Sequence, residues 1–274
     1  MSRRILVDQV KQSLLRIFAI HRRHYYLMRG SWPRIAEMFY WPTVQMVMWG
    51  FMNQYLTQRA EGVYIGAGML IAAFLLWDVL FRSQLGVSLA FFEEIYSRNL
   101  GYLFVSPLRP QELVLSLLSI AVLRTGLGVG VAAWLAIPFY GFSIFDLGWA
   151  LVAFFCNLIF FGWAIGLAVV SMVMRYGMGA ESLAWALVFV FAPITGVYYP
   201  ISVLPQWLQY ISWCLPPTYV FEGLRELIGM HTVNMMFLSY ALVLNLVYVA
   251  IAAALFLVAF RAARQRGLLL QIGE

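Results

Sequence analysis

Two charged residues, Asp78 and Arg124, stand inside stretches of the sequence that are otherwise strongly apolar. Ionisable side chains within an apolar span are costly, and they usually mark a functional site. Counted from the ends of the connecting segment near Phe91 and Leu113, Asp78 lies roughly 20 Å and Arg124 roughly 17 Å along its helix. These similar depths predict an ion pair between the two, which either takes part in function or only supports packing.

A second group of charged residues, Glu222, Arg225 and Glu226, falls on one face of a short helix near His231. Two carboxylates so placed could act as an acid and a base. A surface ion network is the commoner role of such a group.

Histidines and cysteines give little sign of chemistry. His21 and His24 stand among arginines, which is more typical of a solvated basic face than of a pH sensor or a metal site. Cys156 and Cys214 have no spacing that indicates a disulfide framework or a metal site. We therefore expect no bound metal.

The scarcity of lysine excludes a P-loop ATPase. The only lysine is Lys11, and the glycines at Gly128 and Gly130 lie in an apolar stretch without the lysine that a phosphate-binding loop requires. The sequence also lacks the GxSxG and HExxH motifs. We expect no catalysis by the chain itself.

Composition defines the elements that must position these residues. The chain has 274 residues, of which 63% are hydrophobic and 11% charged, and its mean hydropathy is +0.82. These values predict an all-α integral membrane protein, with residues 1–274 forming a single transmembrane domain.

The sequence predicts an amphipathic, basic helix within residues 1–34 that lies at the membrane surface. Six apolar segments follow, each long enough to span a bilayer. They are Met38–Leu56, a segment from Val63 past Arg82, Leu113–Ile137, Leu147–Met174, Leu183–Tyr199 and Val233–Phe260.

The distribution of the 18 Lys and Arg residues predicts the orientation. Most of them precede the first span, follow the sixth, or lie in the loops after the second and fourth, whereas the opposite loops hold only Arg59 and Arg225. Loops rich in Lys and Arg remain in the cytoplasm. Both termini are therefore predicted to be cytoplasmic, and the segment after the fifth span external.

Half of the ten prolines lie between Pro193 and Pro217. They predict helix breaks at Tyr199-Pro200 and at Pro216-Pro217, because proline fixes φ and removes a backbone donor. The apolar pieces between the breaks are too short to cross a bilayer. Residues 200–230 are therefore predicted to form an external re-entrant helical hairpin.

The cytoplasmic loop at residues 89–112 is the other distinctive connection. Phe91, Phe92, Ile95 and Leu100 recur at helical spacing beside charged residues, which predicts a short amphipathic helix. It could be a connector at the lipid surface or a docking element for a soluble partner.

Two motifs in this order resemble those of permease subunits of type-2 ATP-binding-cassette (ABC) exporters. The first comprises Phe92-Glu93-Glu94 and the later residues 106–113, SPLRPQEL, which are similar to the family's coupling helix and the turn that follows it. The second comprises residues 199–202, 204–208, 215–219 and 223–225, which are similar to the family's signature between spans five and six. Pro217 departs from the residue that many members carry there.

The resemblance implies the membrane-spanning part of an ATP-driven transporter. Such permeases dimerise to form the translocation pathway, and a separate ATPase subunit, present in two copies, binds ATP and Mg. The chain would hold no cofactor, would contact membrane lipids but not nucleic acid, and would reside in the bacterial inner (cytoplasmic) membrane with both termini cytoplasmic.

The resemblance also implies roles for three sets of residues. The ATPase-coupling set is Phe92, Glu93, Glu94, Tyr96, Ser97, Arg98, Asn99, Leu100 and Pro107. The external-gate set is Pro200, Leu204, Trp207, Pro216, Tyr219, Glu222 and Arg225. The set at the pathway or dimer interface is Trp41, Trp49, Phe51, Tyr55 and Tyr198, although each of these aromatic residues could instead contact lipid.

Two other functions are compatible with a membrane protein of this kind: a secondary transporter or channel that acts without an ATPase, and a membrane-embedded enzyme that modifies lipids. The sequence shows no inverted repeat, and its candidates for an enzyme are few. The scarcity of charge in the spans weakly favours an apolar or amphipathic cargo. Export rather than import rests on the resemblance alone.

Overall fold

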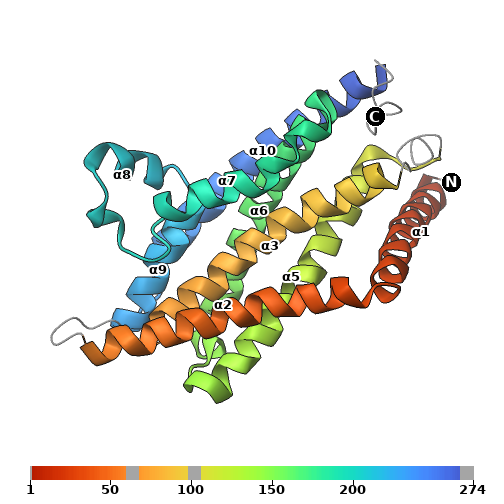
Figure 1. Cartoon of the computed structure of the whole chain (residues 1–274). Helices are drawn as coiled ribbons and strands as arrows, with labels where there is room; N and C mark the ends of the chain where they lie inside the picture. Colours follow the sequence, from red (N-terminus) through yellow and green to blue (C-terminus); the bar gives the residue numbers. More distant parts are fainter. Residues whose placement is uncertain (1, 60–67, 98–105, 266–274) are drawn as a thin grey trace.

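The computed structural model describes residues 2–59, 68–97 and 106–265, and within these ranges all regular structure is helical (Figure 1). Short 3₁₀ turns occur at Ile144–Leu147, Met178–Ala180 and Ile201–Val203. The α-helices are α1 (Ser2–Arg29), α2 (Trp32–Arg59), α3 (Met69–Tyr96), α5 (Pro110–Tyr140), α6 (Trp149–Tyr176), α7 (Ser182–Ile194), α8 (Gln206–Trp213), α9 (Pro216–Met230) and α10 (Met235–Gln265).

Among the described helices, α3, α5, α6 and α10 are long and apolar enough to cross a membrane, so the chain is a multi-pass membrane protein. Helix α2 has 28 residues but is more polar than these four. Helix α7 has only 13 residues, which give about 20 Å against a hydrocarbon thickness of about 30 Å. The count of six spans stays a prediction.

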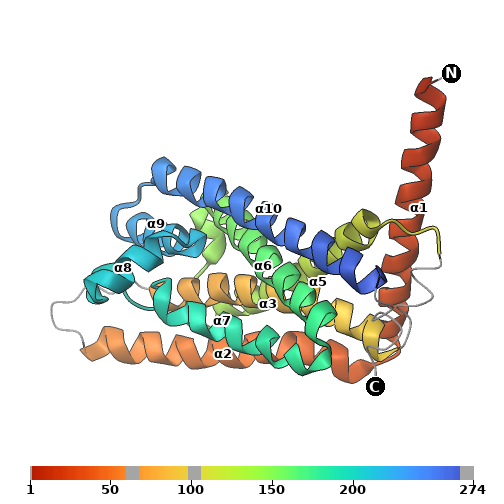
Figure 2. The ribbon, with the colours of Figure 1, turned by 90° about the horizontal axis from the view of Figure 1, so that it is seen from above.

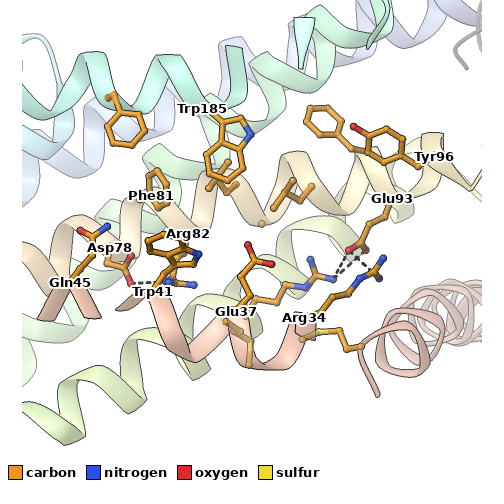
Figure 3. A pocket seen from close by; sticks show the side chains of 18 residues that line it. Arg34, Glu37, Trp41, Gln45, Asp78, Phe81, Arg82, Glu93, Tyr96 and Trp185 are labelled. Atoms are coloured by element: carbon orange, nitrogen blue, oxygen red, sulfur yellow. Dashed lines mark hydrogen bonds and ion pairs between the residues drawn. The ribbon is translucent and has the colours of Figure 1, made fainter. Parts of the chain in front are cut away.

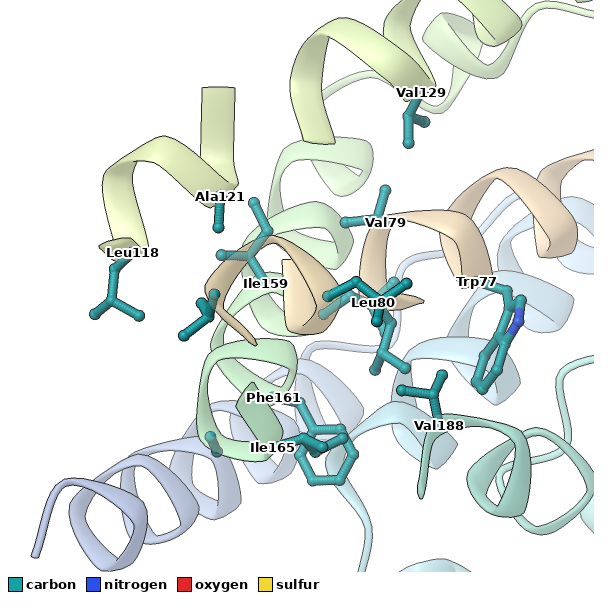
Figure 4. Close-up of a cluster of buried hydrophobic side chains, with 14 of the residues drawn as sticks. Trp77, Val79, Leu80, Leu118, Ala121, Val129, Ile159, Phe161, Ile165 and Val188 are labelled. Atoms are coloured by element: carbon teal, nitrogen blue, oxygen red, sulfur yellow. The ribbon is translucent and has the colours of Figure 1, made fainter. Parts of the chain in front are cut away.

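Helix α3 lies at the centre of the bundle and is buried along almost its whole length, between α2, α5, α6 and α7. A helix that is apolar on every face is suited to such a position. Figure 4 shows Leu80 of α3 among side chains of α6, with Trp77 beside Val188 of α7.

Two glycines allow α6 to approach α3 closely. A Cβ atom added to Gly162 would lie 2.7 Å from the Ser83 Cβ, and one added to Gly166 would lie 2.8 Å from the Val87 Cβ. Small residues four positions apart are a common means of close helix packing in membranes. Side chains at these two positions would push the helices apart.

A polar contact joins α6 to α10. The buried Asn245 side chain donates from Nδ2 to the backbone oxygen and to Oδ1 of Asn157, both at 2.9 Å. Along the rest of α10, large apolar side chains such as Leu246 and Val258 are exposed. An apolar exposed face on a helix of this length is suited to contact with lipid.

The two ends of the bundle carry different elements. Helix α1 and the last turns of α3 and α10 lie at one end, whereas α8 and α9 lie at the other (Figures 1 and 2). Figure 2 also shows α1 projecting away from the direction of the long helices. A helix is therefore present within residues 1–34, as predicted, and the helices that follow the proline breaks lie at the opposite end of the bundle.

The predicted helix breaks near the prolines are confirmed, but the helix before them is shorter than expected. Helix α7 ends at Ile194 rather than at Tyr199, because Gly196 adopts the left-handed backbone conformation with φ 66°. Helix α8 follows Pro205, and α9 begins at Pro216.

The prediction of a separate amphipathic helix from residue 89 is wrong for residues 89–96. These residues continue α3 without a break, and Phe91 and Phe92 are fully buried in the core. The helical period of these apolar residues is the same for a buried helix end as for a helix at the membrane surface, so their spacing alone could not separate the two. Leu100 lies outside the described residues.

Candidate functional site

The structure contains a cavity of about 510 Å³ between α2, α3, α5 and α7. Figure 3 shows aromatic side chains, among them Trp41, Phe81 and Trp185, on its walls together with six charged residues. Its volume lies within the range of pockets that hold drug-sized ligands. The cavity is therefore the candidate functional site.

Within the cavity, Asp78 pairs with Arg82 and not with Arg124. The Arg82 Nε donates to the Asp78 carboxylate at 2.6 Å, one turn away on the same helix. Arg124 instead points toward the end of α3 and contacts Glu93. The predicted Asp78–Arg124 ion pair is therefore wrong.

The prediction failed because it compared only the depths of Asp78 and Arg124 along their helices. It left out the direction of each side chain and the charged residues that lie nearer to it. Ala121 packs directly against Gly86, so Arg124 projects from a level of α5 between Asp78 and Glu93. Its long side chain can extend either way, and Arg82 already occupies the Asp78 carboxylate.

Gly128 provides room for Arg82. A Cβ atom at Gly128 would lie 3.0 Å from the backbone oxygen of Met38 and 3.4 Å from an Arg82 nitrogen. The glycine that could not serve a phosphate loop therefore lets α2, α5 and the Arg82 side chain approach one another.

Glu93, in the last turn of α3, receives basic groups from three other helices. Its carboxylate lies 3.3 Å from Arg124 of α5, 3.7 Å from Arg34 of α2 and 3.6 Å from the Nε2 of His24 in α1. We refer to Glu93, His24, Arg34 and Arg124 as the Glu93 cluster. It connects α1, α2 and α5 to the end of α3.

Two further ion pairs attach α1 to the bundle. Arg23 binds the buried Glu94 at 2.5 Å, and Arg16 binds Glu112 at 2.8 Å. Glu112 also accepts a hydrogen bond from the backbone N–H of Arg109 at 2.9 Å, which caps the start of α5. Helix α1 is thus bound both to the end of α3 and to the start of α5.

His24 is buried, contrary to the prediction of a solvated basic face. Its exposed fraction is 2%, because α1 packs against α5 and the end of α3 at this point. Burial is the largest effect on the imidazole and lowers the pKa of His24 from its ordinary value of 6.5. The nearby Arg124 also lowers this pKa, whereas Glu93 and Glu94 act to raise it.

The residues predicted to contact an ATPase divide into three groups. Tyr96, Ser97 and Pro107 are exposed at the end of the bundle that carries α1. Phe92 and Glu94 are buried and Glu93 is half-buried, so they support this end from inside. Arg98, Asn99 and Leu100 lie outside the described residues.

At the opposite end, Glu222 and Arg225 bind the turn between α7 and α8. Glu222 accepts a hydrogen bond from the Ile201 backbone N–H at 2.7 Å, and Arg225 donates to the Gly196 oxygen at 2.6 Å. The two side chains also pair with each other at 3.0 Å. Their direct role in the structure is to fasten α9 to this turn.

The other predicted gate residues occupy different surroundings. Tyr219 donates to the Trp213 oxygen at 2.8 Å and packs among aromatic rings. Pro216 is buried at the start of α9. Pro200 and Trp207 are exposed, and Leu204 is half-buried.

The five aromatic residues predicted at a pathway or dimer interface do not form one cluster. Trp49 and Tyr198 stack with their ring centroids 4.4 Å apart, which joins α2 to the segment after α7. Phe51 contacts Tyr140 of α5 edge-on, Trp41 lines the cavity, and Tyr55 is half exposed.

The candidates for enzyme chemistry each have a structural role of their own. Glu226 accepts a hydrogen bond from Asn234 at 3.0 Å, and His231 ends α9 with φ 54°. Across residues 2–59, 68–97 and 106–265, no three His, Cys, Asp or Glu side chains are placed to hold a metal ion.

Sequence reasoning missed several residues of the cavity. Arg82, four positions after Asp78, could have been found from its helical spacing. Glu37 has the same spacing to Trp41, a predicted pathway residue, but only the structure places both in one cavity with Trp185 and Phe189.

One family of known proteins matches the sequence. The family is described as ABC-2 type transporter, and its model matches residues 22–229. This range includes the cavity, the Glu93 cluster, α8 and all of α9 except its last residue. No curated protein matches the sequence.

Proposed function

Because the chain belongs to the ABC-2 type transporter family, we propose that it is the permease subunit of an ATP-driven exporter, coupled to a separate ATPase subunit. The family assigns it to the membrane-spanning component of a transporter. The finer proposal adds that two copies form the pathway in a bacterial inner membrane, with both termini cytoplasmic, and that two ATPase subunits bind ATP and Mg. Membrane lipids surround this assembly.

The proposed coupling to an ATPase is supported by one observation: α1 is bound at both ends of the segment that joins α3 to α5. Residues 97–109 join α3 to α5, and α1 is bound to Glu94 on one side of this connection and to Glu112 on the other. A soluble partner that displaced the connection would therefore displace α1, α3 and α5 together. The Glu93 cluster extends this displacement to α2.

The proposed dimer interface lies on α2 and α7. Large apolar side chains on α2 are exposed, although this helix is more polar than the four long spans. Phe189 and Val190 extend the exposed apolar surface onto α7. A second copy would cover this surface, and it would bring two cavities toward one another.

The test is affinity purification of the full chain from its own host in mild detergent, followed by native mass spectrometry. We expect two copies of this chain with two ATPase subunits. Replacing the exposed Tyr96 and Pro107 by Ala is expected to weaken retention of the ATPase about tenfold, because exposed aromatic residues are frequent interface anchors.

The matched control replaces Val203 and Trp207, which are exposed at the opposite end, by Ala. This variant should retain the ATPase at the wild-type level. Transport activity of the chain alone, without ATP, would contradict the proposal and favour a secondary transporter. Activity on a lipid that is lost in Glu222→Gln with Glu226→Gln would favour an enzyme.

A further inference from the structure

We propose that the cavity between α2, α3, α5 and α7 binds an amphipathic organic cation, with Glu37 as the anionic partner of its charged group. This inference names the cargo class of the permease and rests on the function proposed above. It concerns binding to the chain itself, so it can be tested without the ATPase.

The basic residues of the cavity already have carboxylate partners. Arg82 is paired with Asp78 at 2.6 Å, and both Arg34 and Arg124 lie within 4 Å of Glu93. A ligand anion would have to compete with these carboxylates for the guanidinium groups.

Glu37 differs from the other acidic residues of the cavity. It lines the cavity and is exposed, and the described part of the chain offers it no hydrogen bond or ion pair. Figure 3 shows its carboxylate directed into the space between the Arg82–Asp78 pair and the Glu93 cluster. A cation there would meet a carboxylate without a competing partner.

The aromatic side chains suit the rest of such a ligand. Trp41 lies one helical turn after Glu37 on the same face of α2. Across the cavity, Phe81 contacts both Trp185 and Phe189, with ring centroids 6.2 and 5.7 Å apart. Aromatic faces attract organic cations and also bury apolar groups, especially where water is excluded.

The excess of positive charge in the Glu93 cluster determines how the ligand is oriented in the cavity. Arg34 and Arg124 share one carboxylate, so this end of the cavity repels a cation. The charged group is therefore held at Glu37, on the side of Trp41, and the apolar body lies against Trp185 and Phe189.

The experiment measures binding of tetraphenylphosphonium and of tetraphenylborate, two ions of nearly equal size and opposite charge. The full chain is placed in phosphatidylcholine nanodiscs, and equilibrium dialysis is corrected with empty nanodiscs. We expect saturable binding of tetraphenylphosphonium but not of tetraphenylborate. Glu37→Gln should weaken binding of the cation about tenfold, since it removes one charge–charge contact.

Two further variants make the result specific. Glu37→Asp, which keeps the charge, should bind the cation within about threefold of wild type. Glu226→Gln, the same substitution at the opposite end of the bundle, should leave binding unchanged. Circular dichroism and gel filtration of each variant verify that it is folded.

The inference is overturned if tetraphenylborate binds as tightly as the cation, if the cation does not bind, or if Glu37→Gln binds it as wild type does. Retention of the ATPase, measured on the same preparations, keeps the two proposals separate. A chain that retains its ATPase but does not discriminate between the ions contradicts only the inference about cargo.

Discussion

The Arg124 guanidinium of α5 lies 3.3 Å from the Glu93 carboxylate in the last turn of α3. Both side chains are less than one-fifth exposed, so bulk water screens this contact only in part. A charge that sequence depth assigns to the middle of a span thus acts at the end of α3.

A double-mutant cycle can measure this contact. Glu93→Gln and Arg124→Gln are expected to show a coupling of about 1 kcal/mol in the free energy of unfolding, because each removes the same partly buried ion pair. The control cycle combines Arg124→Gln with Asp78→Asn and should be additive within about 0.5 kcal/mol. Coupling in the control cycle alone would restore the Asp78–Arg124 pair.

The glycines of α6 provide a packing test. Gly166→Leu is expected to destabilise the bundle by about 1–3 kcal/mol or to prevent folding, because its Cβ would meet Val87 at 2.8 Å. Gly126→Leu on α5 is the control, since a Cβ there has no heavy atom within 4 Å. Thermal unfolding in detergent measures the stability of both variants. An equal loss of stability in the two variants would contradict the close α3–α6 contact.

His24 predicts how stability depends on pH. Since burial lowers the pKa of His24 in the folded state, the unfolded chain binds a proton more readily. The neutral, buried imidazole therefore contributes to the free energy of unfolding. This contribution is fully present above the unfolded pKa of about 6.5 and is lost as the pH falls from there toward the lower folded pKa. The unfolding temperature should therefore decrease when the pH is lowered from 7.5 to 5.5.

His24→Gln should flatten this pH dependence, whereas His231→Asn, at an exposed helix end, should leave it unchanged. Stability that rises on acidification, and that needs His24, would instead mean that the protonated imidazole pairs with Glu93.

The hairpin can be probed through a single amide. Glu222→Ala removes the acceptor of the Ile201 N–H, so hydrogen exchange at this amide is expected to accelerate about tenfold. Glu222→Gln retains an acceptor oxygen and should preserve most of the protection. Equal exchange in the two variants would show that the side chain does not hold the turn.

Local chemistry allowed the sequence to predict part of this fold. The breaks near Pro200 and Pro216 follow from the missing donor and fixed φ of proline, whatever surrounds it. The amphipathic helix within residues 1–34 follows from its periodicity in the same way. Helix α7 ended early because Gly196 adopts a positive φ, which the sequence permits without requiring.

The candidate site depended on contacts between distant segments. The burial of His24 and the partner of Arg124 are set by how α1 and α5 pack on α3, which no local pattern encodes. Glu37 immediately precedes the predicted first span, Met38–Leu56, and no motif marks it. Its place in the cavity, and the lack of a partner for it among the described residues, follow from how α2 packs against α3 and α7.

The two ion pairs of α1 restrict how its sequence can change. Arg16 and Arg23 are seven residues apart, so they lie about 10.5 Å apart on one helical face, and each binds a different side of the same connection. Insertion of one residue between them would turn one arginine away by about 100°. The spacing of Arg16 and Arg23 must therefore match the positions of Glu94 and Glu112. In a chimaera, α1 and the segment between α3 and α5 should be exchanged together.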